Sequence, residues 1–295
     1  MATDLTLGTI GVWTAVLRAS SAPDRRGEIA EAAAELDDLG FGTLWLGGSP
    51  APDEAGVLLE ATSRITVATG IVSIWDHPAA EVAERYAALN AAHDGRFLLG
   101  LGVSHSARSE RYARPYSAMR EYLSALDAAP APVPAAGRIL AALGPKMLEL
   151  ARDRAVGAHP YLVTPEHTAE ARAALGEAAV LAPELKVVLE PDLDRARAIA
   201  RNYLAFYLAL PNYTNNFVRL GFTEDDFADG GSDRLLSAVF ALGDAAAVRD
   251  RVDEFLAAGA DHLAVQVVTA DPLNDIPLRE WRALAEALPL TAAAS

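Results

Sequence analysis

Residues 25–46, RRGEIAEAAAELDDLGFGTLWL, place a helix, a glycine and a strand in immediate succession. The apolar residues of the first part fall on one helical face; they are Ile29, Ala32, Ala33, Leu36 and Leu39. Gly40 stands where a C-cap glycine belongs, and Thr43 to Leu46 is continuously apolar, as is typical of a strand covered on both faces. Another strand pattern, Leu7 to Trp13, precedes the helix. The order strand, helix, strand predicts a parallel sheet.

The same alternation continues along the chain. We expect further strands at 65–71, 97–101, 139–143, 158–163, 186–189 and 262–267. Helices are expected at 53–63, 78–92, 116–127, 145–154, 165–175, 192–208, 244–257 and 278–287. Eight strands, each followed by a helix, favour a (β/α)8 TIM barrel over an open doubly wound sheet. The open fold would be favoured by a glycine fingerprint after the first strand, and Trp13 to Val16 contains no glycine.

The chain shows no break in composition that would mark a second domain. We therefore expect one barrel domain over residues 1–295. A long helical stretch, about 209–243, interrupts the alternation after the seventh strand. We interpret it as a helical insertion between strands 7 and 8.

Composition excludes several classes of protein. The chain has 25 Lys and Arg against 40 Asp and Glu, a formal net charge of −15, which opposes binding to nucleic acid. It has no uncharged apolar run of about 18 residues, so no membrane span is predicted. It has no cysteine and no N-terminal signal pattern, which predicts a cytoplasmic protein. The six histidines lack metal-ligand spacing, so no metal site is predicted.

The residues that follow the barrel strands are the candidates for chemistry, because barrel active sites lie at the carboxyl ends of the strands. The fourth strand leads into Gly102, Val103 and Ser104, where backbone can approach a ligand closely, and then into His105. Because histidine titrates near neutrality, His105 is the candidate catalytic acid or base. A lone histidine in a loop is more often only solvated.

Two predicted helix starts on neighbouring strands are suited to an anion. The first is Gly144, Pro145 and Lys146, and the second runs from Thr164 to His167. Unpaired N–H groups and the helix dipole attract negative charge at such ends. One helix start alone is a weak signal, but two adjacent ones match the phosphate site common in barrels.

The ordered segments of the chain resemble the luciferase-like monooxygenase superfamily, and within it the branch of F420-dependent oxidoreductases. The segments that carry the resemblance span nearly the whole chain: Gly8 to Trp13, Gly40 to Gly47, Ile65 to Val72, Gly95 to Gly102, Leu140 to Leu148, Leu210 to Thr214 and Gly259 to His262. The resemblance implies a deazaflavin ring across the barrel mouth, against a non-prolyl cis peptide at Gly70–Ile71. It also implies a cofactor phosphate near Gly144 to Lys146 and Thr164 to His167.

The chain departs from the family pattern at two places. Well-studied deazaflavin dehydrogenases carry an Asp-His pair after the second strand, where this chain has Gly48 and Ser49. They carry a glutamate after the fourth strand, where this chain has His105. Their acid and base residues therefore cannot be transferred to this chain.

The resemblance implies hydride transfer between F420 and a small organic substrate, with His105 exchanging a proton. Trp13 is expected to contact the cofactor, and Trp45, Trp75 and Tyr213 are expected to shape the substrate pocket. An FMN-dependent monooxygenase or reductase on the same scaffold stays open as the alternative. A cofactor-free barrel with a binding role is the second alternative. Relatives pair through their second and third helices, so a homodimer is expected.

Overall fold

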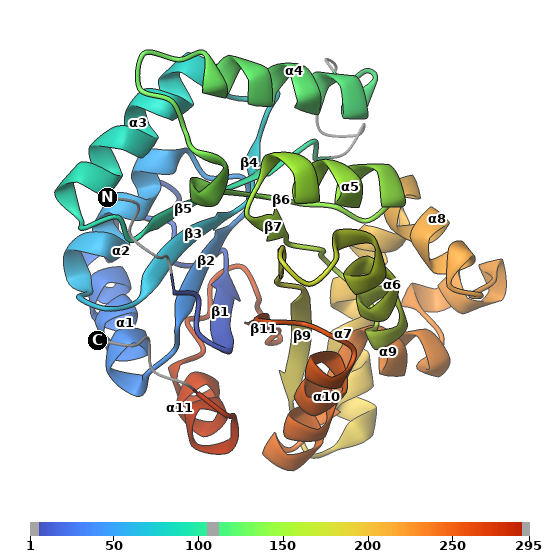
Figure 1. Cartoon of the computed structure of the whole chain (residues 1–295). Coiled ribbons are helices and arrows are strands. Elements are labelled where there is room, and N and C mark those ends of the chain that lie inside the picture. The colour runs from blue at the N-terminus through green and yellow to red at the C-terminus, as the bar shows by residue number, and fades with distance from the viewer. Residues whose placement is uncertain (1–5, 105–111, 291–295) are drawn as a thin grey trace.

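A single sheet of parallel strands curls into a barrel, and helices cover its outer face (Figure 1). The computed structural model describes residues 6–104 and 112–290. The first strands neighbour one another in chain order, from β1 (Ile10–Thr14) and β2 (Thr43–Gly47) to β3 (Thr66–Gly70). They are followed by β5 (Phe97–Gly102), β6 (Arg138–Leu140) and β7 (Gly157–Ala158). A short strand, β4 (Val72–Ser73), continues β3 beyond Ile71 and pairs with β5.

The ring of strands closes through one segment, residues 180–189. Its first part, β8 (Val180–Leu181), pairs with β7, and its second part, β9 (Glu184–Leu189), pairs with β11 (Leu263–Val267). β11 pairs in turn with β1. Because every pair is parallel, the carboxyl ends of the strands meet at one mouth. The predicted (β/α)8 TIM barrel is confirmed.

The helices that alternate with these strands have nearly the predicted bounds. They are α1 (Arg26–Leu39), α2 (Ala55–Ala61), α3 (Ala79–Ala92), α4 (Pro115–Asp127), α5 (Pro145–Arg154), α6 (Pro165–Leu175), α10 (Ala245–Ala257) and α11 (Leu278–Ala287). Short 3-10 turns lie at η1 (Pro23–Arg25), η2 (Pro52–Glu54) and η4 (Ala135–Gly137). Gly40 ends α1 in the left-handed conformation, at φ 90°, where a residue without a Cβ is favoured.

The insertion follows β9 and packs around a core of its own. It contains α7 (Leu193–Leu208), α8 (Pro211–Arg219), η5 (Glu224–Gly230) and α9 (Asp233–Val239). The prediction of a helical stretch up to about 243 is wrong at its end, because β10 (Phe240–Gly243) is a strand parallel to β9. Phe240 and Ala241 are buried there, so packing against the sheet overrides the helical continuation.

Two predicted strands end earlier than expected. β6 stops at Leu140 rather than Leu143, and β7 stops at Ala158 rather than Val163. In both cases the apolar residues beyond the strand turn into the wall of a cavity at the barrel mouth. Their apolar character therefore reflects burial at the mouth and not pairing in the sheet.

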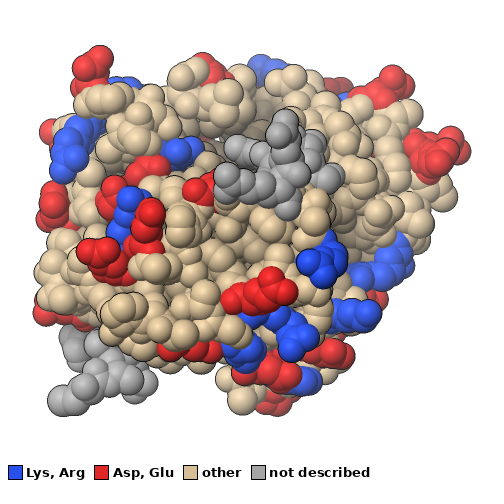
Figure 2. Space-filling model, turned by 90° about the horizontal axis from the view of Figure 1, so that it is seen from above, with Lys and Arg blue, Asp and Glu red and all other residues tan. Residues whose placement is uncertain are grey.

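The surface seen from above carries both signs of charge. Figure 2 shows Lys and Arg side chains interspersed with Asp and Glu side chains, around broad areas of uncharged residues. Exposed pairs such as Arg85 with Asp53 contribute little to stability, because water and salt screen them. None of the described helices is long and apolar enough to cross a membrane.

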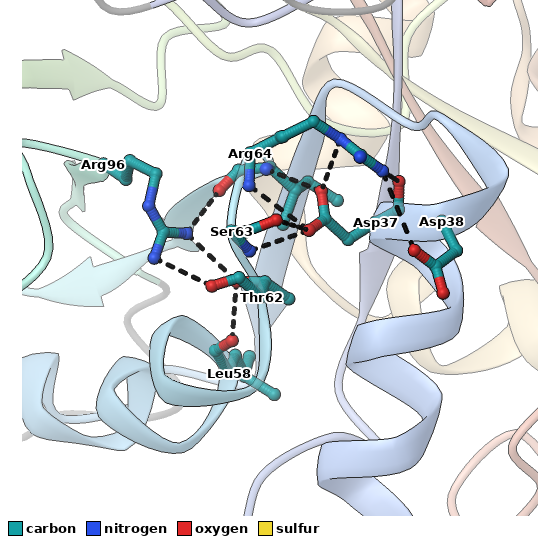
Figure 3. Close-up of polar contacts among 8 residues, drawn as sticks. Asp37, Asp38, Leu58, Thr62, Ser63, Arg64 and Arg96 are labelled. Carbon is teal, nitrogen blue, oxygen red and sulfur yellow. Dashed lines mark hydrogen bonds and ion pairs between the residues drawn. The ribbon is translucent and has the colours of Figure 1, made fainter.

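The corner between α1 and β3 is fixed by one buried carboxylate (Figure 3). Asp37 accepts hydrogen bonds from the backbone N–H groups of Ser63 at 2.7 Å, Arg64 at 3.2 Å and Ile65 at 2.9 Å. Arg96 lies on the other side of the same turn and donates to the carbonyl oxygens of Leu59, Thr62 and Ile65. The start of β3 is thus held by a side chain from each neighbouring unit.

We expect Asp37→Ala to lower the free energy of unfolding by about 3 kcal/mol, because it leaves the buried N–H of Ile65 and the part-buried N–H groups of Ser63 and Arg64 without their acceptor. Burial alone would raise the pKa of Asp37, but the hydrogen bonds from Ser63, Ile65 and Arg64 lower it. The stabilisation is therefore present above the unfolded pKa and is lost as the pH falls through the lower folded pKa. Urea denaturation measures the effect, and Asp38→Ala, at a side chain 86% exposed, is the matched control. Equal stabilities of the two variants would contradict this account of the corner.

Candidate active site

A cavity of about 550 Å³ opens at the carboxyl ends of the strands. Its wall is built by the ends of β1 and β3, by the segments after β2, β3, β5, β6 and β7, and by residues of α4, α5, α7 and α8. Most of the lining is apolar or aromatic. This is the location and the character expected of a small-molecule site in a barrel.

Most of the predicted site residues line this cavity. They are Trp13, Gly70, Ile71, Val103, Ser104, Gly144, Pro145, Lys146 and Tyr213. The Gly70–Ile71 peptide bond is cis, at the position that the resemblance implied. His105, the predicted acid or base, lies outside the described residues.

Two predicted pocket walls do not line the cavity. Trp45 is completely buried inside the barrel, because it lies in the middle of β2 and points inward. Trp75 is half-buried and donates its indole N–H to the carbonyl oxygen of Val103 at 2.6 Å. Its ring also lies 5.9 Å from that of Tyr112, so it supports two lining residues from behind.

Three predicted cofactor contacts also lie behind the wall. Gly102 is packed under Ile71, whose side-chain carbons would lie 2.7 Å from a Cβ at Gly102. Thr164 caps α6, and its hydroxyl accepts a hydrogen bond from the His167 N–H. The His167 ring donates from Nε2 to the Leu143 carbonyl oxygen at 2.9 Å. These residues hold lining segments in place and do not face the cavity.

The floor of the site is a polar and aromatic plug inside the barrel. Trp45 stacks on His159, with ring centroids 4.1 Å apart, and donates its N–H to His262 Nε2 at 2.9 Å. His262 Nδ1 donates to the Gly8 carbonyl oxygen at 2.8 Å. Burial lowers the pKa of both histidines to about 4, so both are neutral near pH 7. The plug thus links β2 to the start of β1 and to the segments around β7 and β11.

His159 presents an unpaired nitrogen lone pair to the underside of the site. Its Nδ1 donates to the Ala182 carbonyl oxygen at 2.6 Å, so Nε2 carries no hydrogen. Both His159 Nε2 and the Trp13 indole N–H are buried and have no hydrogen-bond partner among the described residues. Both atoms lie beneath Gly70, where an added Cβ would be 3.5 Å from the first and 2.6 Å from the second.

Glycines make room for the Trp13 ring. A Cβ at Gly47 would lie 2.3 Å from two carbons of the Trp13 indole, and one at Gly70 would lie 2.6 Å from its nitrogen. The ring therefore crosses the ends of β2 and β3, which only glycines allow it to approach so closely.

The far end of the cavity is the start of α5. Lys146 is exposed in its first turn. Arg219, at the end of α8, donates to the Leu143 carbonyl oxygen at 3.1 Å and to Asn216 at 2.7 Å. Within 4 Å, a Cβ at Gly144 would meet only the Arg219 guanidinium among residues 6–104 and 112–290, at 4.0 Å, so the space beside Gly144 is open. Two cations and a helix N-terminus suit a phosphate group.

The loop after β2, where the resemblance implied an Asp-His pair in related dehydrogenases, forms a structural turn in this chain. Arg18 donates to the Gly48 carbonyl oxygen at 2.8 Å and pairs with Glu54. The Ser49 hydroxyl lies 3.3 Å from an Asp76 carboxylate oxygen and accepts from the Ser73 N–H at 3.2 Å. The residues of this loop that line the cavity, Gly48 and Ser49, are therefore neither acid nor base.

Sequence reasoning missed several lining residues, namely His159, Tyr161, Phe206 and Tyr207. It also missed Arg219, whose guanidinium lies next to the lining residue Gly144. Tyr161 follows β7, and Tyr207 lies on α7 one turn after Tyr203. The four-residue spacing of the two tyrosines shows that they share a helix face. No sequence pattern shows that this face meets the barrel.

Comparison with known proteins assigns the family. The sequence model of the luciferase-like monooxygenases matches residues 9–262, so the chain belongs to this family. No curated protein sequence matches the chain.

Solved structures of similar fold have low sequence identity. An F420-dependent secondary alcohol dehydrogenase in complex with an F420-acetone adduct is 15% identical, with a TM-score of 0.71, and the match covers 96% of this chain and 98% of that one. The coenzyme F420 dependent tetrahydromethanopterin reductase of Methanopyrus kandleri is 17% identical, with a TM-score of 0.72 and coverage of 97% and 99%. The FMN-bound oxygenating constituent of 3,6-diketocamphane monooxygenase of Pseudomonas putida is 15% identical, with a TM-score of 0.69 and coverage of 97% and 98%. The chain is thus a luciferase-like oxidoreductase by family and by fold.

The neutral plug predicts a pH-dependent stability. The unfolded histidines bind protons near pH 6.5, whereas the folded ones do so only near pH 4. As the pH is lowered from 6.5 to 4, the free energy of unfolding should therefore fall by about 1.4 kcal/mol per pH unit for each histidine. We expect His262→Gln, which can keep the contacts with Trp45 and Gly8, to reduce this slope.

Urea denaturation at several pH values measures the slope. His93→Gln, after α3 and outside the barrel interior, is the control and should keep the slope of the unmodified protein. An unchanged slope in His262→Gln would mean that His262 is not held neutral in the folded state.

Proposed function

We propose that the protein transfers a hydride between a deazaflavin cofactor of the F420 type and a small organic substrate. The observation that carries the proposal is the form of the cavity. Its apolar part, between Ile71, Val103 and Trp13, leads to an open, positively charged helix start at Gly144. A planar ring with a phosphate-bearing side chain has the same two parts.

The residues of the chain fit such a group at both ends. Lys146, Arg219 and the first turn of α5 would hold the phosphate. Ile71, Val103 and the Trp13 ring would enclose the planar part and exclude water from it. When bound, a deazaflavin supplies or accepts a hydride, and the protein supplies binding, orientation and electrostatics.

The neighbours in fold support both this cofactor and a second one. Two of them carry F420 in their names, and a third was solved with FMN. FMN also has a planar tricyclic ring and a phosphate, so an FMN-dependent monooxygenase or reductase is the second candidate.

A fluorescence titration of the purified protein with F420 and, separately, with FMN tests the proposal. We expect F420 to bind at least tenfold more tightly than FMN, a difference of about 1.4 kcal/mol. The opposite preference would assign the protein to the flavin enzymes. Binding of neither cofactor would contradict the proposal and favour a barrel with a binding role.

A charge substitution tests the orientation of the cofactor. We expect Lys146→Gln to weaken F420 binding about three- to tenfold, because it removes a cation beside the phosphate. The affinity for the same deazaflavin ring with its ribityl chain but without the phosphate should not change. Arg279→Gln, at a side chain 88% exposed on α11, is the control. Equal losses for F420 and for this phosphate-free form would place the phosphate elsewhere.

A further inference from the structure

Three tyrosines and a glutamine form a closed ring of hydrogen bonds at one side of the cavity. The Tyr161 hydroxyl donates to Gln266 Oε1 at 2.8 Å, and Gln266 Nε2 donates to the Tyr203 hydroxyl at 2.6 Å. The Tyr207 hydroxyl oxygen lies 3.1 Å from that of Tyr203 and 2.9 Å from that of Tyr161. Tyr161 and Tyr207 line the cavity, so the ring ends at its surface.

Counting donors and acceptors in this ring shows that one hydroxyl hydrogen can point away from the ring. The Tyr161 hydrogen is used on Gln266, and Tyr203 already accepts from Gln266, so Tyr203 donates to one of the other two hydroxyls. Tyr161 can accept from Tyr203, at 3.2 Å, as well as from Tyr207. The Tyr207 hydrogen can therefore turn into the cavity while every other member of the ring keeps its bonds.

The ring is held from below by a completely buried ion pair. Lys186 Nζ lies 2.8 Å from Glu184 Oε2 and 3.6 Å from the centre of the Tyr161 ring. The same carboxylate oxygen accepts from the Leu162 N–H at 3.1 Å, next to Tyr161. Lys186 is also the register partner of Gln266 between β9 and β11. A buried ion pair is weak evidence for stability, but this one fixes the position of Tyr161 and, through it, of Tyr207.

We propose that the Tyr207 hydroxyl donates a hydrogen bond to the oxygen of the substrate. The substrate is then an uncharged carbonyl compound, or the corresponding alcohol, with an apolar body. The assignment of this position to a substrate rests on the proposed oxidoreductase function. Beside the apolar Phe206, a phenol hydroxyl satisfies a neutral oxygen, whereas a carboxylate placed there would lose more solvation than one phenol returns. Burial and the neighbouring phenols raise the pKa of Tyr207, so the hydroxyl keeps its hydrogen at neutral pH.

A pair of ligands with one shape tests the assignment in the full-length protein without cofactor. Acetophenone and α-methylstyrene differ by the exchange of a carbonyl oxygen for a CH2 group. Ligand-observed NMR titrations should show that the ketone binds up to about tenfold more tightly, the effect of one net hydrogen bond. Tyr207→Phe should abolish the preference and leave the affinity for α-methylstyrene unchanged.

Two further variants separate the hydrogen bond from cavity shape. Tyr112→Phe, a lining tyrosine outside the ring, should keep the preference for the ketone. Tyr203→Phe should reduce it, because Tyr161 then has only the Tyr207 hydrogen to accept. A preference that survives Tyr207→Phe, or an equal loss for both ligands, would overturn the assignment. So would an unchanged preference in Tyr203→Phe, which also decides the question if Tyr207→Phe does not fold.

Repeating the titration with F420 present separates this inference from the proposed function. If F420 binds and acetophenone still binds more tightly than α-methylstyrene, the hydrogen-bonded ring of tyrosines faces the substrate. If F420 displaces acetophenone, the hydrogen-bonded ring of tyrosines recognises the cofactor, and the assignment of Tyr207 to a substrate is wrong. If F420 does not bind, the proposed function fails, and with it the assignment of the ring to a substrate.

Discussion

The position of Trp45 inside the barrel is the constraint on which the rest of the site depends. Its indole ring stacks on His159 and donates to His262, and both histidines donate in turn to backbone carbonyl oxygens. Because these bonds join polar groups that are buried in the barrel, they fix the relative positions of several strands. Gly11 is part of the same arrangement, since a Cβ there would lie 2.8 Å from the His262 ring.

The cavity above the plug results from strands that stop early. β6 and β7 leave the sheet after Leu140 and Ala158, and the residues that follow them become its wall. The insertion completes the wall from the other side, because α7 brings Tyr203 and Tyr207 to Tyr161. One side of the cavity is thus part of the barrel, and the opposite side is part of the insertion. The residues of the insertion can therefore change the shape of the pocket without a change in the barrel.

Much of the fold could be predicted from the sequence, because local signals and burial agree there. Gly40 after α1 and the prolines that begin α5 and α6 mark their helices correctly. The end of the insertion was not predictable, because β10 is a strand only through its pairing with β9. In the site, most of the residues found follow strand ends, such as Val103 after β5, but His159 and Tyr161 after β7 were missed. Trp45 and Trp75 are as apolar as a pocket wall, and only the direction of their side chains shows that they lie behind it. Tyr207 and Arg219 reach the site from helices whose docking no local pattern encodes.

The central claim is that the cavity holds a planar cofactor between the end of β3 and the insertion. A crystal structure of the protein soaked with F420 tests it most directly. The account predicts electron density for the ring against Ile71 and Trp13, with the phosphate at the start of α5 beside Lys146 and Arg219. Density for the cofactor outside the cavity, or with its phosphate at the Tyr161 side, would contradict it.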